Sequence, residues 1–212
     1  MLVKEYGSKT FNILVGKTVT GFMQFEQAGK FIMDKLRKEL PAHLVYHSID
    51  HITDVYKAAA QLARYEKLSK QETQLLLTAA YYHDAGFIVQ TAGHEEESCR
   101  IVRQTLPDFN YTTEEIEQIC GLIKATQIPQ SPKNHLEEVL ADADLDYLGR
   151  DDYFTISEKL YEELVIADEI KSMEEWKQVQ INFMEKHRYF TPTAINLRQA
   201  TKEENLKKIK AS

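Results

Sequence analysis

The sequence predicts an all-α fold, in which a single helical bundle follows a short irregular or extended N-terminal arm. From Gln24 onward, apolar residues recur at spacings of three and four, which is the period of an amphipathic helix. The breaks between these segments carry helix caps, prolines and glycines. The 212 residues, of which 43% are hydrophobic and 28% are charged, are enough for one large domain with a buried core.

The first 22 residues differ from the rest of the chain. The segment FNILVGKTVTGFM is rich in β-branched residues and is interrupted by glycines, so it favours an extended arm or a short hairpin. We therefore assign residues 1–22 to an N-terminal arm and residues 23–150 to a helical core. Residues 151–212 are expected to form further helices that pack on the same domain or provide a homodimer surface.

Three helices are predicted in the first part of the core. The first spans residues 26–40, where an apolar stripe ends before a proline, and the second spans residues 45–66. Ser69 and Glu72 form a capping-box pattern for the third helix, which runs through LLLTAAYYHD and stops at Gly86.

Six more helices are expected from the same signals. Pro107 ends one of them, Asn134 is a suitable N-cap for another, and Thr191 followed by proline is a common helix start. No repeat or linker divides this region. The expected spans are 94–106, 113–126, 135–148, 152–170, 173–187 and 193–210.

The net charge and the cysteine content limit the classes of partner and the cell compartment that the sequence favours. The net charge of -7 argues against a nucleic acid or an anionic membrane surface as the main partner, because phosphate-backbone binding needs a basic excess. It leaves room for a small phosphorylated ligand. Cys99 and Cys120 form no disulfide framework, which is typical of thiols in a reducing cytosol. With no apolar run near the roughly 20 residues of a membrane span and no secretory signal, the protein is predicted to be cytoplasmic.

Polar side chains interrupt the predicted helices at positions where apolar residues would be expected. In YHSIDHITDV, His47 and His51 are four apart and Asp54 follows three later, so all three line one side of a helix. His83 and Asp84 extend the apolar rows of the next helix, so their side chains should point inward near its last turn.

A further group of carboxylates lies in LADADLDYLG. Asp144 continues the apolar row of its helix, whereas Asp142 falls on the far side from that stripe. Asp144 is therefore favoured as the inward carboxylate, with Asp146 a weaker second choice. Buried charges are costly unless they are paired or bound to a metal. Two imidazoles and two carboxylates that converge from three helices could hold one divalent ion, for which Mn, Fe, Co, Ni, Zn and Mg are candidates.

Each of these patterns also has an ordinary explanation. A single buried histidine is more often a hydrogen-bonded core residue than a ligand, and a His-Asp pair at a helix end is weak by itself. An Asp-x-Asp-x-Asp run is usually a solvated acidic face. The ordered set favours a metal site: a His pair, then His-Asp on the next helix, then an aspartate inside a later apolar stripe.

With this set, the sequence resembles the HD-domain superfamily of metal-dependent phosphohydrolases, which are helical bundles with ligands in the order His…His-Asp…Asp. His51 matches the first histidine, and His83 and Asp84 match the dipeptide. Asp144 matches the final aspartate, and the resemblance covers residues 25–149. It implies an HD-type metal-binding core, one divalent metal ion, and hydrolysis of a phosphate mono- or diester, with a nucleotide as the expected substrate.

The resemblance also assigns roles to individual residues. YHSIDHITDV is similar to the first helix of cyclic-nucleotide phosphodiesterases, in which the residue matching His47 is a general acid on the leaving oxygen. Asp84, besides binding the metal, is expected to orient or deprotonate the attacking water. Members with two metals have two further histidines. His94 is a candidate for one of them or for a base, whereas Thr126 and Gln127 stand where the other would fall, so one tightly held ion is expected.

The predicted substrate contacts and the predicted activity each have an alternative interpretation. Lys124 and Arg150 are candidate phosphate contacts because each lies close in sequence to a polar cluster, and ordinary exposed helix-end cations are the alternative. A non-catalytic module that senses a nucleotide or a metal is the alternative function, and an oxidative site with paired irons would need the additional histidines. A nucleoside monophosphate, a cyclic nucleotide, a guanosine polyphosphate and a non-nucleotide ester all fit the sequence.

Overall fold

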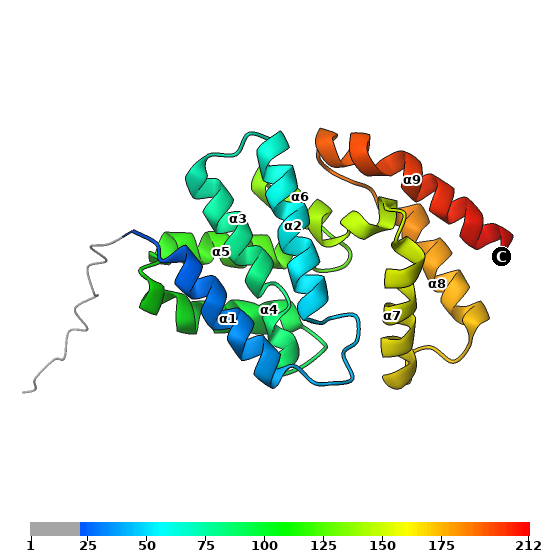
Figure 1. Ribbon diagram of the computed structural model, residues 1–212, viewed down its shortest axis with the longest axis horizontal. Helices are drawn as coiled ribbons and strands as arrows, with labels where there is room; N and C mark the ends of the chain where they lie inside the picture. Colours follow the sequence, from blue (N-terminus) through cyan, green and yellow to red (C-terminus); the bar gives the residue numbers. More distant parts are fainter. Residues whose placement is uncertain (1–21) are drawn as a thin grey trace, which may run out of the picture.

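The computed structural model describes residues 22–212, and this part of the chain contains nine α-helices, three short 3₁₀-helices and no strand (Figure 1). The all-α prediction is confirmed. The predicted arm, residues 1–22, lies outside the described residues except for Phe22. The elements are α1 (Phe25–Glu39), α2 (Ile49–Tyr65), α3 (Lys70–Tyr82), η1 (Ala85–Ile88), α4 (His94–Thr105), η2 (Leu106–Phe109), α5 (Thr113–Ala125), α6 (His135–Asp144), η3 (Asp146–Gly149), α7 (Tyr153–Ile166), α8 (Met173–Lys186) and α9 (Pro192–Ala211).

Three helix starts that the sequence predicts are confirmed by side-chain caps. The Ser69 hydroxyl accepts a hydrogen bond from the N–H of Glu72, whose carboxylate accepts one from the N–H of Ser69, and this capping box begins α3. Asn134 caps α6 through its side chain. Thr191 caps α9, where a proline follows at the first helical position. Each cap satisfies a backbone N–H group that has no partner within its helix.

The helix predicted over residues 45–66 begins later in the structure. α2 starts at Ile49, and Ser48 before it has an extended backbone with φ -120° and ψ 177°. The two N–H groups just upstream donate to a carboxylate on α7 rather than to helical carbonyls. His47 therefore precedes the helix and does not share a face of it with His51.

The helix predicted over residues 135–148 is divided in the structure. α6 ends at Asp144, and Leu145 leaves the helical region with φ -106° and ψ 18°. The chain then tightens into η3. The break separates Asp144 from Asp146 and places the two carboxylates in different surroundings.

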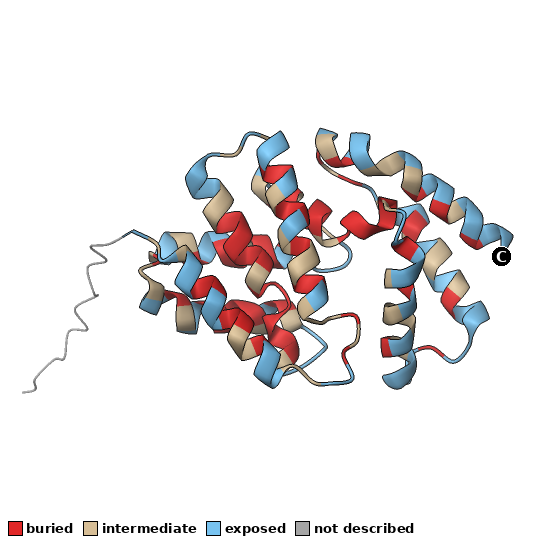
Figure 2. Cartoon of the chain, viewed as in Figure 1, coloured by how far each residue is buried: buried red, intermediate tan, exposed pale blue. Residues whose placement is uncertain are grey.

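The main core is formed by the helices from α1 to α6 (Figure 2). Burying a large apolar side chain in such a core stabilises the fold by about 1.5–3 kcal/mol. Because α2 packs against both α3 and α6, this core also fixes the relative positions of the segments that carry the site. Its fully buried side chains include Ile32, Leu36, Ile52, Leu62, Leu76, Ile119 and Ile123.

The C-terminal helices α7, α8 and α9 lie on one side of this bundle (Figure 1). Gly149 of η3 comes so close to α9 that a Cβ atom would lie 2.3 Å from the carbonyl oxygen of Arg198. The division into residues 23–150 and 151–212 stays a prediction. A second, smaller core joins the two parts and contains Tyr46, Leu145, Tyr147, Leu148, Tyr153, Met184 and Ile209.

None of the helices within residues 22–212 has the length and apolar character needed to cross a bilayer. Cys99 and Cys120 are free and buried on the neighbouring helices α4 and α5. Each thiol lies near the backbone carbonyl of the other, at 3.5 and 3.8 Å.

Candidate metal centre

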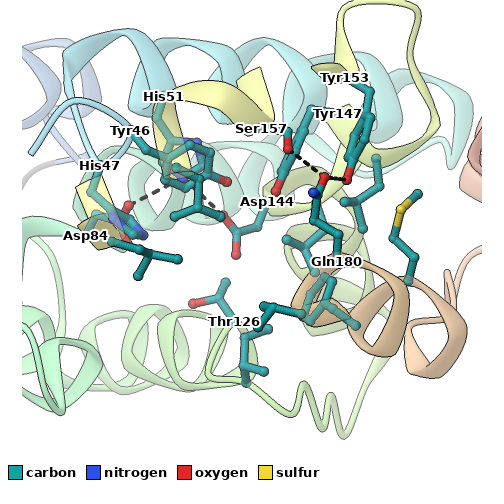
Figure 3. A pocket seen from close by; sticks show the side chains of 18 of the residues that line it. Tyr46, His47, His51, Asp84, Thr126, Asp144, Tyr147, Tyr153, Ser157 and Gln180 are labelled. Atoms are coloured by element: carbon teal, nitrogen blue, oxygen red, sulfur yellow. Dashed lines mark hydrogen bonds and ion pairs between the residues drawn. The ribbon is translucent and has the colours of Figure 1, made fainter. Parts of the chain in front are cut away.

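A cavity of about 490 Å³ lies between the bundle and the C-terminal helices (Figure 3). Side chains of α7 and α8 form one wall of it, although residues 151–212 carry no chemical motif in the sequence. The polar end of the cavity is lined by His47, His51, Asp84, His94 and Asp144.

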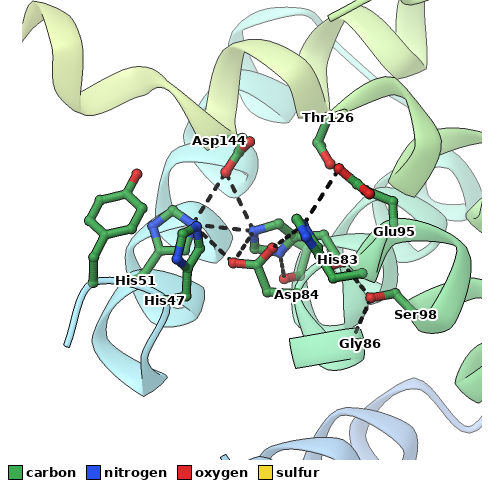
Figure 4. A network of polar contacts seen from close by, with 12 residues as sticks. His47, His51, His83, Asp84, Gly86, Glu95, Ser98, Thr126 and Asp144 are labelled. Carbon is green, nitrogen blue, oxygen red and sulfur yellow. Dashed lines mark hydrogen bonds and ion pairs between the residues drawn. The ribbon is translucent and has the colours of Figure 1, made fainter. Parts of the chain in front are cut away.

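Four side chains from three segments meet at this polar end (Figure 4). His51 comes from the first turn of α2, and His83 and Asp84 come from the turn after α3. Asp144 is the last residue of α6. Nε2 of His51 lies 3.3 Å from Nε2 of His83. Oδ1 of Asp144 lies 3.2 and 3.4 Å from these two nitrogens, and Oδ2 of Asp84 lies 3.4 and 3.2 Å from them.

These separations fit ligands that share one small ion. Ligand atoms about 2.1 Å from a metal are about 3.0 Å apart in neighbouring octahedral positions and about 3.4 Å apart in a tetrahedron. Oδ2 of Asp84 is also buried without a hydrogen-bond partner among residues 22–212, which is costly unless a cation satisfies it. Figure 4 shows Asp84 and Asp144 on opposite sides of the two imidazoles. The ligand atoms of His51, His83 and Asp144 all lie within 4.8 Å of one another, so these three residues fit a divalent ion, and Asp84 is the proposed fourth ligand.

Backbone contacts fix the ring of His83. Its Nδ1 lies 2.9 Å from the carbonyl oxygen of Ala80, so Nδ1 carries a proton and Nε2 faces the other ligands. Ser98 of α4 donates to the carbonyl of His83 at 2.7 Å and accepts from the N–H of Gly86 at 2.8 Å. Gly86 has no room for a side chain, because a Cβ atom would lie 2.0 Å from the carbonyl oxygen of His94. A serine inside a helix gives no sequence signal for this role.

The centre carries negative charge that favours a cation. Burial opposes charge on Asp84, but the neighbouring His83 outweighs it and holds the pKa of that carboxyl well below its usual range. Burial likewise opposes charge on Asp144, but hydrogen bonds from His51 and His83 lower its pKa to about 2. Burial disfavours the protonated form of His83, yet the charge of Asp84 raises its pKa. A proton therefore competes with a metal ion for the nitrogen of His83.

His47 lies beside the centre and is held by Glu163 of α7. One oxygen of Glu163 contacts Nδ1 of His47, and the other accepts from the N–H groups of Tyr46 and His47 at 2.9 and 3.1 Å. The ring of His47 stacks on Phe87 with centroids 4.2 Å apart. Burial lowers the pKa of His47, but the hydrogen bond to Glu163 and the charge of Asp84 outweigh it and raise that pKa. In the sequence, Glu163 resembles any residue of an acidic helix face.

His94 begins α4 and lies near Oδ1 of Asp84, whereas Oδ2 of Asp84 lies near His51 and His83. Nε2 of His94 is 3.5 Å from Oδ1 of Asp84 and 3.6 Å from Oε1 of Glu95. Its Nδ1 is 3.0 Å from the carbonyl oxygen of Thr91, which leaves Nε2 to face the cavity. Thr126, where a further histidine would be expected, also lines the cavity. The role of His94 as a second metal ligand or a base stays a prediction.

The other two carboxylates of LADADLDYLG lie away from the centre. Asp142 is fully buried and accepts hydrogen bonds at 2.8 Å from two backbone N–H groups just before α9. Asp146 is also buried and pairs with Arg198 at 2.7 Å. Asp144 is thus the carboxylate of this run that reaches the two histidines, and the run is not a solvated acidic face.

Lys124 and Arg150 do not line the cavity. Lys124 is exposed, and its Nζ pairs with Glu96 at 2.6 Å. Arg150 pairs with Asp54 at 2.8 Å and with Asp152 at 2.6 Å, so neighbouring carboxylates neutralise its charge. Because Asp54 pairs with Arg150, its carboxylate does not join His51 at the centre. Nearness in sequence to a polar cluster therefore did not bring either predicted phosphate contact to the site.

Comparison with solved structures finds the same fold in two bacterial proteins. The crystal structure of a Lactobacillus plantarum protein matches with a TM-score of 0.63 and 22% sequence identity, over 89% of this chain and 98% of that chain. The crystal structure of a predicted HD superfamily hydrolase from an uncultured Thermotogales bacterium matches with a TM-score of 0.55 and 18% identity, over 86% of this chain and 91% of that chain. No curated protein matches this chain.

The comparison with protein families matches the part of the chain that contains the centre. The profile of the HD-CE family matches residues 34–178. This range is more than half of the chain, and it contains the four converging side chains together with His47 and Glu163. The chain therefore belongs to the HD-CE family and is an HD-domain protein.

Proposed function

We propose that the protein is a metal-dependent phosphohydrolase that cleaves a phosphate mono- or diester. The observation that carries this proposal is that three of the four proposed metal ligands, His51, Asp84 and Asp144, line one cavity together with the carboxylate-held imidazole of His47. The fold similarity to a predicted HD superfamily hydrolase supports the hydrolase class. A nucleotide is the substrate class that the resemblance to HD phosphohydrolases implies.

The metal would be held by the four converging side chains. A mixed imidazole and carboxylate set suits Mn, Fe, Co, Ni or Zn, and Mg is a further candidate. Such an ion, when bound, lowers the pKa of a water molecule and polarises a phosphoryl oxygen. The proposed ligands are His51, His83, Asp84 and Asp144.

Asp84 would act on the attacking water, and His47 would act on the leaving group. Oδ2 of Asp84 points toward the other ligands, whereas Oδ1 faces His94 and would orient or deprotonate the attacking water. As the water oxygen bonds to phosphorus, the bond from phosphorus to the leaving oxygen breaks. The raised pKa of His47 favours its protonated form, so its Nε2 donates a proton to the leaving oxygen. Glu163 orients the ring and stabilises the imidazolium before the transfer.

Replacing Asp84 tests the proposal directly. Asp84→Ala removes a proposed ligand and the group that orients or deprotonates the water, so we expect loss of bound metal and of phosphate release from 4-nitrophenyl phosphate and bis(4-nitrophenyl) phosphate. Asp50→Ala, which removes an exposed carboxylate from α2, is the matched control. Normal metal content and full turnover in Asp84→Ala would contradict the proposal.

His47→Gln separates the proton donor from the ligands. Turnover should slow by roughly 100-fold or more, the usual contribution of a general acid, while metal content stays unchanged. Loss of metal in this variant would make His47 a ligand and remove its role as a proton donor.

A binding module without turnover is the second candidate function. Among residues 22–212, no lysine or arginine lines the cavity, so the chain offers the transition state no positive side chain besides its histidines. Such a module would show a raised melting temperature with Mn²⁺ and a nucleotide but no phosphate release. Turnover with any nucleotide would exclude it.

A further inference from the structure

Beyond the metal centre, the cavity continues into a mostly apolar chamber between η3, α7 and α8 (Figure 3). At about 490 Å³, the whole cavity falls within the size of small-molecule sites, roughly 300–1,000 Å³. The chamber therefore has room for a ring system attached to a phosphate at the centre. Its walls are formed mainly by Tyr153, Leu160, Leu164, Trp176, Phe183 and Met184.

The charges along the cavity disfavour a second anionic group on the ligand. Besides Asp84 and Asp144 of the centre, the carboxylates of Glu95 and Glu169 line the cavity, and no lysine or arginine from residues 22–212 does. An ion at the centre would neutralise one phosphoryl group. A second phosphate in the chamber would meet apolar walls and further carboxylates, and desolvating an unpaired anion is costly. The rest of the ligand should therefore be uncharged.

Gln180 of α8 faces this chamber with a fixed side-chain amide (Figure 3). Its Oε1 accepts hydrogen bonds from the hydroxyls of Tyr153 at 2.7 Å and Ser157 at 2.8 Å. Burial raises the pKa of Tyr153 to about 12, so this hydroxyl keeps its proton at neutral pH. Both acceptor positions of Oε1 are thus used, and Nε2 makes no hydrogen bond with any residue of 22–212. The amide is left with N–H donors for a ligand.

We propose that the substrate is an ester of a single phosphate with an uncharged, ring-containing alcohol, and that Gln180 selects it by donating a hydrogen bond to an acceptor on the ring. This inference rests on the proposed function, because the ion at the centre is taken to hold the phosphoryl group. It separates the substrate from guanosine polyphosphates and other polyphosphates, which carry several anionic groups.

Binding of phosphonates to the full chain loaded with Mn²⁺ tests the ligand class without turnover. Methylphosphonate, phenylphosphonate and 4-acetylphenylphosphonate add first a ring and then a hydrogen-bond acceptor. In calorimetric titrations, phenylphosphonate should bind at least about tenfold more tightly than methylphosphonate, because its ring leaves water. The acetyl group should add about fivefold more. Equal affinity for the three probes, or binding of none, would overturn the inference.

Two variants isolate the role of Gln180. Gln180→Glu keeps an acceptor for both hydroxyls but loses the N–H donors, and Gln180→Ala loses both. In each variant the fivefold gain from the acetyl group should disappear, while the tenfold gain from the ring remains. The control is Gln178→Ala, which removes an exposed amide of the same helix that donates to Asn182 at 2.9 Å. Retention of the acetyl gain in Gln180→Glu would overturn the assignment of Gln180.

Phosphate release is measured separately from phosphonate binding, so that the hydrolase function and the ligand class are tested independently. Failure to release phosphate from any ester, with the binding pattern of the three phosphonates intact, would contradict the hydrolase function and leave the ligand class standing. Release of phosphate from 4-nitrophenyl phosphate, with equal phosphonate affinities, would leave the hydrolase function and overturn the ligand class.

Discussion

The carboxylate of Glu163 holds the imidazole of His47 across 116 residues of sequence. The same carboxylate accepts the backbone N–H groups of Tyr46 and His47, so α7 fixes both the ring and the turn that carries it. This contact joins the C-terminal helices to the helical bundle at the candidate metal centre. It also explains how His47 can lie beside the centre without being part of α2.

Glu163→Gln should change the pH dependence of phosphate release. Glu163 raises the pKa of His47, and a general acid is active only below its pKa, so activity is lost as the pH rises through that value. A neutral amide at this position should move the alkaline limb of kcat to lower pH. At about pH 8 we expect a loss of roughly tenfold in kcat, with a smaller loss at about pH 6.

The control for this prediction is Glu162→Gln, which removes an exposed carboxylate next in sequence. Its pH profile should match that of the wild type. A Glu163→Gln profile that is lowered equally at every pH would mean that Glu163 is only structural.

The affinity for Mn²⁺ should fall on acidification. Burial lowers the pKa of His83, but Asp84 and Asp144 outweigh burial and raise it. A proton and the ion compete for Nε2, so affinity is highest above this pKa and falls as the pH drops below it, by up to about tenfold per pH unit. Calorimetric titration with Mn²⁺ between about pH 8 and pH 6 measures this loss. An affinity that stays constant over this range would show that His83 is not a ligand.

His187, outside the centre, should make the fold less stable in acid. Burial and the charge of Lys202 lower the pKa of His187 to about 3, whereas an unfolded histidine has a pKa of about 6.5. The unfolded chain therefore takes up the proton first, and stability is lost as the pH falls from about 6.5 toward 3.

In urea titrations, the free energy of unfolding should fall between about pH 7.5 and pH 5 in both proteins. The fall should be roughly 1–2 kcal/mol smaller in His187→Phe than in the wild type. His43→Gln, at an exposed position, is the control and should behave as the wild type. Identical pH dependence in His187→Phe and the wild type would show that His187 is protonated equally in both states.

Gly86→Ala should distort the turn after α3. The added Cβ would lie 2.0 Å from the carbonyl oxygen of His94, so the start of α4 must move. We expect a loss of about 2–4 kcal/mol in the free energy of unfolding and a weaker affinity for Mn²⁺. Gly121→Ala is the matched control, because its Cβ would meet only a side-chain oxygen of Glu137 at 3.2 Å. Equal stability of the two variants would contradict this explanation.

The elements and the ligands could be predicted because their signals are local. Ser69 and Asn134 cap helices through residues three positions away. His83 and Asp84 continue the apolar rows of α3 just past its end, and Asp144 continues the row of α6; a row that faces the core carries its polar members inward.

The second wall of the site could not be predicted because it depends on contacts between distant segments. In the sequence, Glu163 and Gln180 look like ordinary polar residues of amphipathic helices, and their partners are fixed by how α7 and α8 pack. Lys124 and Arg150 show the reverse effect, since each is near a polar cluster in sequence but pairs with carboxylates outside the cavity.

An anomalous difference map from crystals grown with Mn²⁺ tests the metal assignment most directly. The map should show its strongest peak between His51 and His83, within bonding distance of Oδ2 of Asp84 and Oδ1 of Asp144, at about 2.0–2.3 Å. A map with no peak among these four side chains, or with Mn²⁺ bound elsewhere, would contradict the assignment and the hydrolase proposal with it.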